Sequence, residues 1–294
     1  MPSVFTYDDA AVREDLLDMI TNIDPEEDQL YVGLAKHKAQ QPYHQWLTDT
    51  LTAVGTVSRA EGFDPSFASR TNPARKANYT QIISAEFQVT DSERNSNTAG
   101  FKDRYTYEMQ KAMLEWRRFA EYAIVRGSLI SGTGSAARQM AGVFAQITTL
   151  ATNHGSVSLS ETLMNTFLQN AWNQGGNVDM ILVGGTLKRR ISTFTNTNTR
   201  FVDAAQSNVN NTINVYDSDF GRVEVHKHRY VNVAADVNLQ MLGLEKDKWA
   251  VAHLDEPHYQ EIPRTGYSSK GMIVGELTLE GLNQASSFAT TNLQ

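Results

Sequence analysis

The stretch that decides the fold spans residues 103–126 and reads DRYTYEMQKAMLEWRRFAEYAIVR. It is the longest uninterrupted helical pattern in the chain, because no proline or glycine breaks it before Gly127. At about 1.5 Å per residue, a helix of this length spans roughly 36 Å, about the width of a small domain. Steps of four and three place one stripe of side chains on its predicted buried face: Met109, Met113, Trp116, Ala120, Ala123 and Gly127.

The opposite side of this helix is predicted to be solvated or to meet another chain. Lys111 and Glu115 stand at i,i+4, and Arg117 and Glu121 repeat the spacing. Each such pair stabilises a helix by a few tenths of a kcal/mol. Asp103 at the start suits the positive end of the helix dipole. We expect the other segments of the chain to attach to this helix, which we call the spine.

Composition narrows the class of protein. The chain has 294 residues, 40% hydrophobic and 20% charged, which is enough to bury a core and to divide into two or more lobes. Cysteine is absent, which excludes disulfides, cysteine-based zinc sites and thiol nucleophiles. A net charge of -7 argues against tight, sequence-independent wrapping of nucleic acid. The acidic N-terminus and the lack of any run of 18 apolar residues predict a soluble protein without an export signal.

Two segments before the spine are predicted to gain their burial from elsewhere. Residues 5–20 hold a short amphipathic pattern that forms no compact unit alone. Residues 36–78 alternate polar and apolar positions and are interpreted as a long two-stranded excursion with an irregular tip. An isolated hairpin is marginal in water, so the excursion must lie on its own body or on a neighbouring subunit. Residues 81–89 are predicted to return from it as a strand.

The residues after the spine predict an α/β lobe. Ser158–Glu161 resembles a capping box that opens a helix, and residues 178–183 form a short apolar strand. Gly184-Gly185 and a further helix follow, and such a helix N-terminus could bind an anion. Tight strand-to-helix turns also use glycine without any ligand, which is the favoured interpretation. The Gly- and Ser-rich residues 131–138 are interpreted as a helix stop and a loop, because the lysine of a phosphate-binding loop is missing.

The last third of the chain is predicted to be mostly strands, at residues 213–216, 222–233, 248–254 and 272–279, with Pro257 and Pro263 at edges or turns. His226 and His228 share one face of such a strand and could share a metal, although exposed strand histidines are favoured because no third ligand stands beside them. No nucleophile elbow, zinc-protease, dinucleotide-binding or calcium-loop motif occurs. These absences favour a structural role over an enzyme.

The order of these elements resembles the major capsid proteins of tailed bacteriophages with the HK97 fold, and several stretches resemble the SU10-like subfamily in particular. The resemblance runs over almost the whole chain and rests on the shared order of its motifs: Ile20–Pro25, His44–Asp49, Glu61-Gly62, Asn78–Ile82, Ala136–Gly142, Arg264–Gly266 and Glu276–Leu279.

The resemblance implies an α+β, HK97-like fold. Its parts would be an N-terminal arm (1–35), an extended β-hairpin loop with flanking strands (36–93), a peripheral domain with the spine helix (94–150), an axial α/β domain (151–222), and strands that return to both domains (223–294). It implies self-assembly through hexamers and pentamers into an icosahedral virion shell around double-stranded DNA, formed in the bacterial host cytoplasm. Scaffolding, portal and decoration proteins would be separate partners, and no cofactor, metal, membrane or catalysis is expected.

Charged residues of the excursion are candidates for contacts between subunits: Arg59, Glu61, Arg70, Arg75 and Lys76. They could equally be solubilising charges, because surface ion pairs often contribute little. Two alternatives stay open. One is an encapsulin-like nanocompartment shell, which shares the fold and encloses enzymes. The other is a nucleotide- or anion-binding enzyme built on residues 178–190.

Overall fold

The computed structural model describes most of the chain. Of the described residues, 29% are helical and 39% lie in strands. The described residues are 29–52, 54–56, 58–65, 67, 69–96, 103–194, 215–232 and 239–294. The predicted mixture of helix and sheet is confirmed. The predictions for residues 5–20, and for most of the polar segment 193–214, lie outside the described residues.

The chain folds as two compact units. The first contains Ser84–Trp116 and His258–Val274, and the second contains Glu27–Ile83, Arg117–Pro257 and Gly275–Gln294. The spine helix α3 (Arg104–Arg126) and three long strands contribute to both units. Helix α3 begins one residue after the predicted start of the spine and ends at the predicted residue, so this prediction is confirmed.

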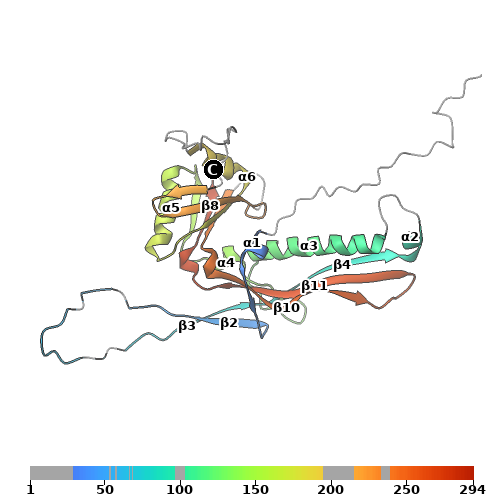
Figure 1. Cartoon of the computed structure of the whole chain (residues 1–294), viewed down its shortest axis with the longest axis horizontal. Coiled ribbons are helices and arrows are strands. Elements are labelled where there is room, and N and C mark those ends of the chain that lie inside the picture. Colours follow the sequence, from blue (N-terminus) through green and yellow to red (C-terminus); the bar gives the residue numbers. More distant parts are fainter. Residues whose placement is uncertain are drawn as a thin grey trace, which may run out of the picture. The chain divides into compact units, whose positions relative to one another are not determined.

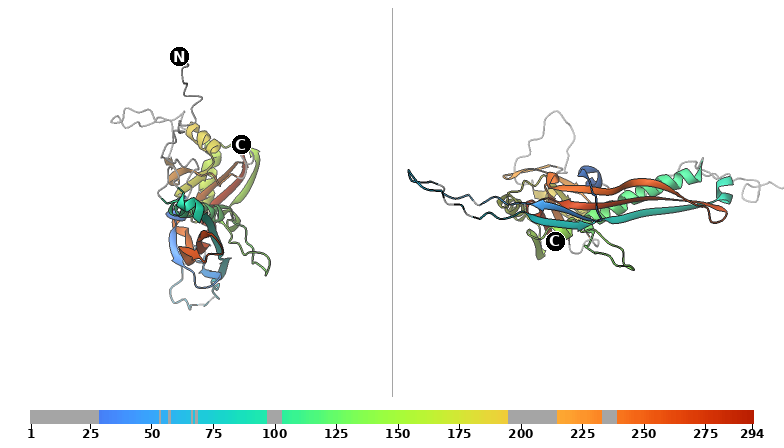
Figure 2. Two further views of the ribbon diagram at one scale, coloured as in Figure 1. Left: turned by 90° about the vertical axis from the view of Figure 1, so that its right-hand side faces the viewer. Right: turned by 90° about the horizontal axis from the view of Figure 1, so that it is seen from below.

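A four-stranded sheet has the order β1-β10-β11-β4. Its strands are β1 (Ala35–Lys38), β10 (Trp249–Ile262), β11 (Ser268–Gly281) and β4 (Gln81–Thr90). The long strands β4, β10 and β11 run beside one another in Figure 2. After β4 comes the short helix α2 (Asp91–Asn95), whose N-cap Thr90 accepts a hydrogen bond from the amide of Glu93. A Cβ on Gly271 would lie 2.8 Å from Phe87, Tyr105 and Tyr259, so this glycine lets three aromatic rings close over β11.

The burial of the spine differs in part from the predicted stripe. Trp116, Ala120 and Ala123 are buried as predicted, but Met113 is 48% exposed. Towards its C-terminal end the helix also buries Glu121 and Ile124, which lie outside the stripe. A single 3.6-residue pattern assumes one packed face, whereas this half of α3 is covered on more than one side.

A six-stranded mixed sheet, ordered β5-β12-β9-β6-β8-β7, lies in the second unit. Its strands are β5 (Ala151–Val157), β12 (Phe288–Leu293), β9 (Leu239–Leu244), β6 (Met180–Val183), β8 (Gly221–Lys227) and β7 (Val215–Ser218). Helices α5 (Glu161–Asn173) and α6 (Gly185–Thr193) bury Phe167, Leu187 and other apolar side chains against it (Figure 1). Ser160 caps α5 and accepts the Leu163 amide at 3.2 Å, as the capping box predicted. This lobe has its own apolar core.

Some elements were not predicted. They are β1, β5, β9, β12, the short helices α1 (Gln29–Gly33), α2 and α4 (Val143–Gln146), and the 3₁₀ turns η2 (Lys246–Lys248) and η3 (Gln284–Ser286). The strand predicted at 222–233 ends already at Lys227. Pro257, predicted as an edge or turn, lies inside β10, where the strand is exposed. Among the described residues, no helix is long and apolar enough to cross a membrane.

Candidate assembly surface

The excursion is built on a separate two-stranded sheet. Strands β2 (Tyr43–Thr48) and β3 (Ala74–Tyr79) pair antiparallel, from Tyr43 opposite Tyr79 to Thr48 opposite Ala74. Beyond this stem, the described residues between 49 and 73 form neither helix nor strand, and Figure 1 shows them as a long open loop. The predicted two-stranded excursion with an irregular tip is therefore confirmed.

Large apolar side chains of the excursion are exposed. Leu51 and Phe67 in the loop are 98% and 94% exposed, and Leu47 on β2 is 67% exposed. Val54 is fully exposed as well. Single exposed apolar residues are ordinary on protein surfaces, but several on one projecting segment mark an interaction site.

The five charged candidates lie on two parts of the excursion. Arg59, Glu61 and Arg70 belong to the loop, whereas Arg75 and Lys76 stand on β3, and all five are exposed. The guanidinium of Arg59 lies over the ring of Phe63 at 5.1 Å. Within the described part of the chain, no ion pair holds any of the five. The structure does not gather them into one cluster, so their role as subunit contacts stays a prediction.

The base of the excursion, in contrast, is tied to β11 by buried polar contacts. The Glu280 carboxylate is 6% exposed and lies 2.7 Å from His37 Nδ1 and 2.6 Å from His44 Nε2. A carboxylate only accepts hydrogen bonds, so both imidazoles donate to it. Trp46 Nε1 donates to the carbonyl of Gly281 at 3.2 Å. These contacts fix β2 to the end of β11.

Asn78 fixes the other strand of the stem. Its side chain is 1% exposed, and its Nδ2 donates to the carbonyls of Ala141 at 3.0 Å and Leu279 at 2.8 Å. Its Oδ1 accepts the Ala141 amide at 2.8 Å. One amide side chain therefore joins β3, β11 and the segment after the spine, and all its contacts are satisfied, as burial demands.

A partly buried ion pair lies next to this amide. Arg138 binds the Glu276 carboxylate, which also accepts from the Thr80 hydroxyl, and Arg138 Nε donates to the carbonyl of Thr80 at 2.9 Å. Thr278 Oγ1 donates to the carbonyl of Tyr79 at 2.9 Å. The stem is thus held by a connected polar network, while the described residues of the loop beyond it make no such contacts with the rest of the subunit.

A second buried junction lies on the spine. Glu121 and His228 are both buried, and His228 Nε2 lies 2.8 Å from Glu121 Oε1. His226 instead pairs with Glu224 at 3.1 Å, where both side chains are exposed. The two histidines therefore have different carboxylate partners, and the prediction that both are exposed strand residues is wrong for His228. Over the described residues, no group of three possible ligands could hold a metal.

The turn from β6 into α6 has a packing reason for the first of its two glycines. A Cβ on Gly184 would lie 2.1 Å from Nδ2 of Asn232. Lys188, on the first turns of α6, is 5% exposed and donates to the carbonyl of Val225. Burial lowers its pKa to about 8. The side chain that could have met an anion is therefore directed to the backbone of β8, which favours the ligand-free interpretation of this turn.

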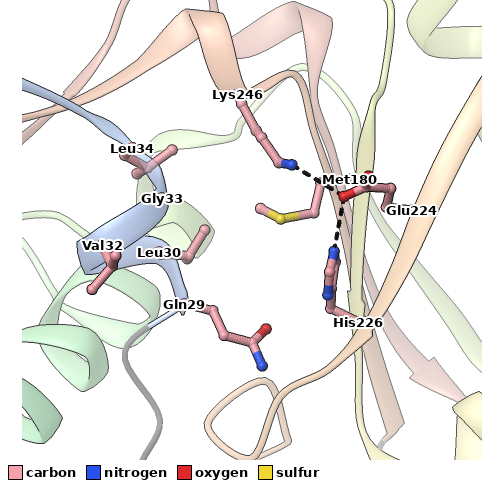
Figure 3. A pocket seen from close by; sticks show the side chains of 9 residues that line it. All are labelled: Gln29, Leu30, Val32, Gly33, Leu34, Met180, Glu224, His226 and Lys246. Atoms are coloured by element: carbon pink, nitrogen blue, oxygen red, sulfur yellow. Dashed lines mark hydrogen bonds and ion pairs between the residues drawn. The ribbon is translucent and has the colours of Figure 1, made fainter. Parts of the chain in front are cut away.

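A cavity of about 300 Å³ lies between α1 and the strands β6 and β8. Figure 3 shows Leu30 and Leu34 on one side of it, Met180 on the other, and Glu224 between His226 and Lys246 at the rim. Lys246 Nζ lies 3.3 Å from Glu224, so the rim charges are mutually paired. The cavity offers no arrangement of a nucleophile, a base and an oxyanion site.

Sequence reasoning missed the buried anchors as a group. His44, Asn78, Arg138 and Glu276 stand in four of the stretches that carry the family resemblance, and the fold brings them together at the base of the excursion. Their contacts join residues 63 to 236 positions apart, so no local spacing could have revealed them. The only available signal was that polar residues recur inside otherwise apolar segments.

A family model described as "SU10 major capsid protein" matches residues 3–294. The chain belongs to the SU10 major capsid protein family. It is a major capsid protein of a tailed phage, and its fold is HK97-like. The HK97-like fold implied by the resemblance is confirmed. No curated protein sequence matches the chain.

Solved structures share the fold at low sequence identity. The Gordonia phage Cozz structure is 13% identical with a TM-score of 0.65, covering 99% of this chain and 98% of that one. The capsid of a native GTA particle is 10% identical with a TM-score of 0.69, covering 97% and 96%. The SrpI encapsulin of Synechococcus elongatus PCC 7942 is 9% identical with a TM-score of 0.58, covering 97% and 93%. The encapsulin alternative is therefore not favoured.

Proposed function

We propose that copies of this chain assemble through hexamers and pentamers into a closed icosahedral shell that contains double-stranded DNA. The protein works by burying surface between copies and performs no catalysis. The shell forms in the host cytoplasm and becomes part of the virion. Family membership supports this proposal, as do the solved capsid structures of the same fold.

One observation supports the proposal most directly: polar contacts hold the stem of the excursion, whereas large apolar side chains of its loop are exposed. Buried contacts to Glu280 and Glu276 hold the stem, yet Leu51 and Phe67 remain almost fully exposed. Covering one such side chain is worth about 1.5–3 kcal/mol, and nothing in the described part of the same chain covers them. Repeated contacts of this kind between unlike surfaces close into rings and then into shells.

The family resemblance also suggests a role for each part of the chain. Residues 1–35 would be the arm and 36–93 the extended loop with its flanks. Residues 94–150 would form the peripheral domain and 151–222 the axial domain, with 223–294 returning to both. Arg59, Glu61, Arg70, Arg75 and Lys76 would contact neighbouring subunits. Portal, scaffolding and decoration proteins would join as separate chains; one solved relative is a phage G capsid described with decoration proteins.

The proposal is tested by replacing the exposed apolar anchors. Leu51→Glu should leave the subunit folded and abolish shells, because a carboxylate cannot be buried in an apolar contact without a partner. Thr52→Glu, at the exposed neighbouring position, is the matched control and should assemble. Light scattering and negative-stain microscopy on the full chain expressed alone would report particle mass and shape. Normal shells from the Leu51 variant would contradict the role of the loop.

The contents of purified particles separate the shell of a virus from a cellular compartment. We expect nuclease-protected double-stranded DNA in particles made during infection, held without sequence-specific contacts. Particles that contain only a protein cargo would instead support the encapsulin-like alternative.

A further inference from the structure

Helix α1, the first described element, is held to the spine by a single buried carboxylate. The amide of Leu30 donates to Glu121 Oε1 at 2.9 Å, and the amide of Tyr31 donates to Glu121 Oε2 at 2.7 Å. The first N–H groups of any helix lack partners within the helix. Here a side chain 91 residues away in the sequence satisfies them.

A third donor completes the junction. His228 Nε2 lies 2.8 Å from Glu121 Oε1, and His228 Nδ1 accepts from the amide of Tyr230 at 3.3 Å. Since Nδ1 is the acceptor, the proton of the neutral ring lies on Nε2 and points at Glu121. His228 follows β8 directly, and its own amide donates to the carbonyl of Val183 on β6 at 2.9 Å. Glu121 therefore joins α1, the spine and the six-stranded sheet.

A cavity borders α1 on the side of the six-stranded sheet. The cavity of about 300 Å³ lies between α1 and the strands β6 and β8, so dispersion contacts are missing there (Figure 3). One exposed hydrogen bond spans that side, from Gln29 Nε2 to the carbonyl of Lys227 at 3.1 Å. The ammonium of Lys36 lies 3.9 Å from the centre of the Tyr31 ring on the same short segment. Leu30 and Leu34 are buried, so apolar packing and the polar contacts at Glu121 together hold α1.

We infer that Glu121 is a positioning residue for assembly: with His228 it fixes the place and direction of helix α1 on the body of the subunit. This inference rests on the proposed assembly function. Residues 1–28 carry nine acidic side chains and one basic one, so a segment of net charge -8 starts from this point. A subunit that must repeat in identical contacts needs each attached segment to start from one fixed geometry.

Glu121→Gln tests the inference, because glutamine has the same shape and only one acceptor oxygen. Three donors converge on Glu121, so the amide group of glutamine must face at least one of them. We expect hydrogen exchange in a peptide covering residues 29–34 to become about tenfold faster or more. Shells made by this full-length variant should form in lower yield or in mixed sizes at a temperature where the variant stays folded.

A matched control separates positioning from stability. Gly243→Ala disturbs the six-stranded sheet, because its Cβ would lie 2.1 Å from the Phe288 ring, and it does not contact α1. At equal loss of melting temperature, this variant should keep slow exchange in residues 29–34 and should assemble normally. Equal assembly defects in both variants, or normal shells from Glu121→Gln, would overturn the inference.

His228→Gln provides a second variant if Glu121→Gln does not fold, since it changes one donor of the three and should give an intermediate exchange rate. Unchanged exchange in residues 29–34 with this variant would contradict the junction as described. Failure of the wild-type chain to form any particle would contradict the proposed function instead, while the exchange comparison on isolated subunits would still test the role of Glu121.

Discussion

Replacing Glu280 with glutamine should release the stem of the excursion while the rest of the subunit stays folded. The carboxylate is 6% exposed and accepts from His44 at 2.6 Å and from His37 at 2.7 Å. Glutamine keeps the shape of the side chain, but it removes the charge and turns one acceptor into a donor that faces an imidazole N–H. The change therefore acts on two hydrogen bonds and leaves packing nearly constant.

The magnitude follows from how deeply each partner is buried. The His44 side chain is 16% exposed, so its bond to the carboxylate falls in the range of about 1.5–3 kcal/mol for hydrogen bonds to charged groups. His37 is 46% exposed, and its contribution is that of a surface pair, about 0–1 kcal/mol. Together these give a loss of roughly 1.5–4 kcal/mol in the free energy that holds β2 closed.

Hydrogen exchange followed by mass spectrometry would measure this loss in peptides covering residues 43–48 and 74–79. Glu224→Gln is the matched control, because Glu224 pairs with His226 at 3.1 Å on the surface, where both side chains are exposed. This control should change the free energy of opening of the stem, calculated from the exchange rates, by less than about 0.5 kcal/mol. Equal effects of the two variants, or an unchanged stem in Glu280→Gln, would refute the account of a buried anchor.

Four substitutions, one of them a control, test other parts of the structure. Burial lowers the pKa of Lys188 from 10.5 to about 8, so between these values the unfolded chain binds a proton that the folded chain lacks. Chemical denaturation should therefore show stability rising from pH 8 towards pH 10, and Lys188→Met should remove that part of the rise. Gly243→Ala should cost about 1–3 kcal/mol against the Phe288 ring, whereas Gly185→Ala, with nothing within 4 Å, should be nearly neutral in a melting experiment. Asn78→Ala should lower the free energy of unfolding by about 1–3 kcal/mol, because the Ala141 amide loses its acceptor while the carbonyls of Ala141 and Leu279 keep only the donor Gln146; no change in denaturation midpoint would contradict this.

Local sequence patterns predicted the elements whose own residues are enough to determine their structure. The spine needs only a long run without breakers, and α5 needs a cap and an apolar face, so both were predicted within a few residues. The excursion was predictable because its alternation is long and interrupted by prolines and glycine. In these cases propensity and packing favour the same structure.

Elements that depend on distant partners could not be predicted in this way. Strand β1 is exposed along its whole length and is a strand because it pairs in parallel with β10, about 200 residues later in the chain. Strand β12 lies between β5 and β9, and its sequence FATTNL has no clear alternation. The predicted stripe failed in two ways: Met113 is exposed, and the C-terminal half of α3 buries Glu121 and Ile124, which lie outside the stripe.

The anchors of the candidate surface were hidden from local reasoning for a related reason. A glutamate such as Glu121 or Glu280 looks like a solvated charge until the fold brings donors to it from far along the chain. Glu121 was paired with Arg117 on the outer face of the predicted spine, yet it is buried against α1 and His228. Charged residues are almost never fully buried without partners, so burial is what identifies them as anchors.

The most direct test of the central claim compares hydrogen exchange of residues 49–73 in assembled particles and in dissociated subunits of the full chain. If the bare loop is covered by a neighbouring copy, its amides should exchange at least about tenfold more slowly in particles, while the core strands β6 and β9 exchange alike in both states. Equal, fast exchange of the loop in intact particles would show that the excursion is not a contact between subunits, and would contradict the account.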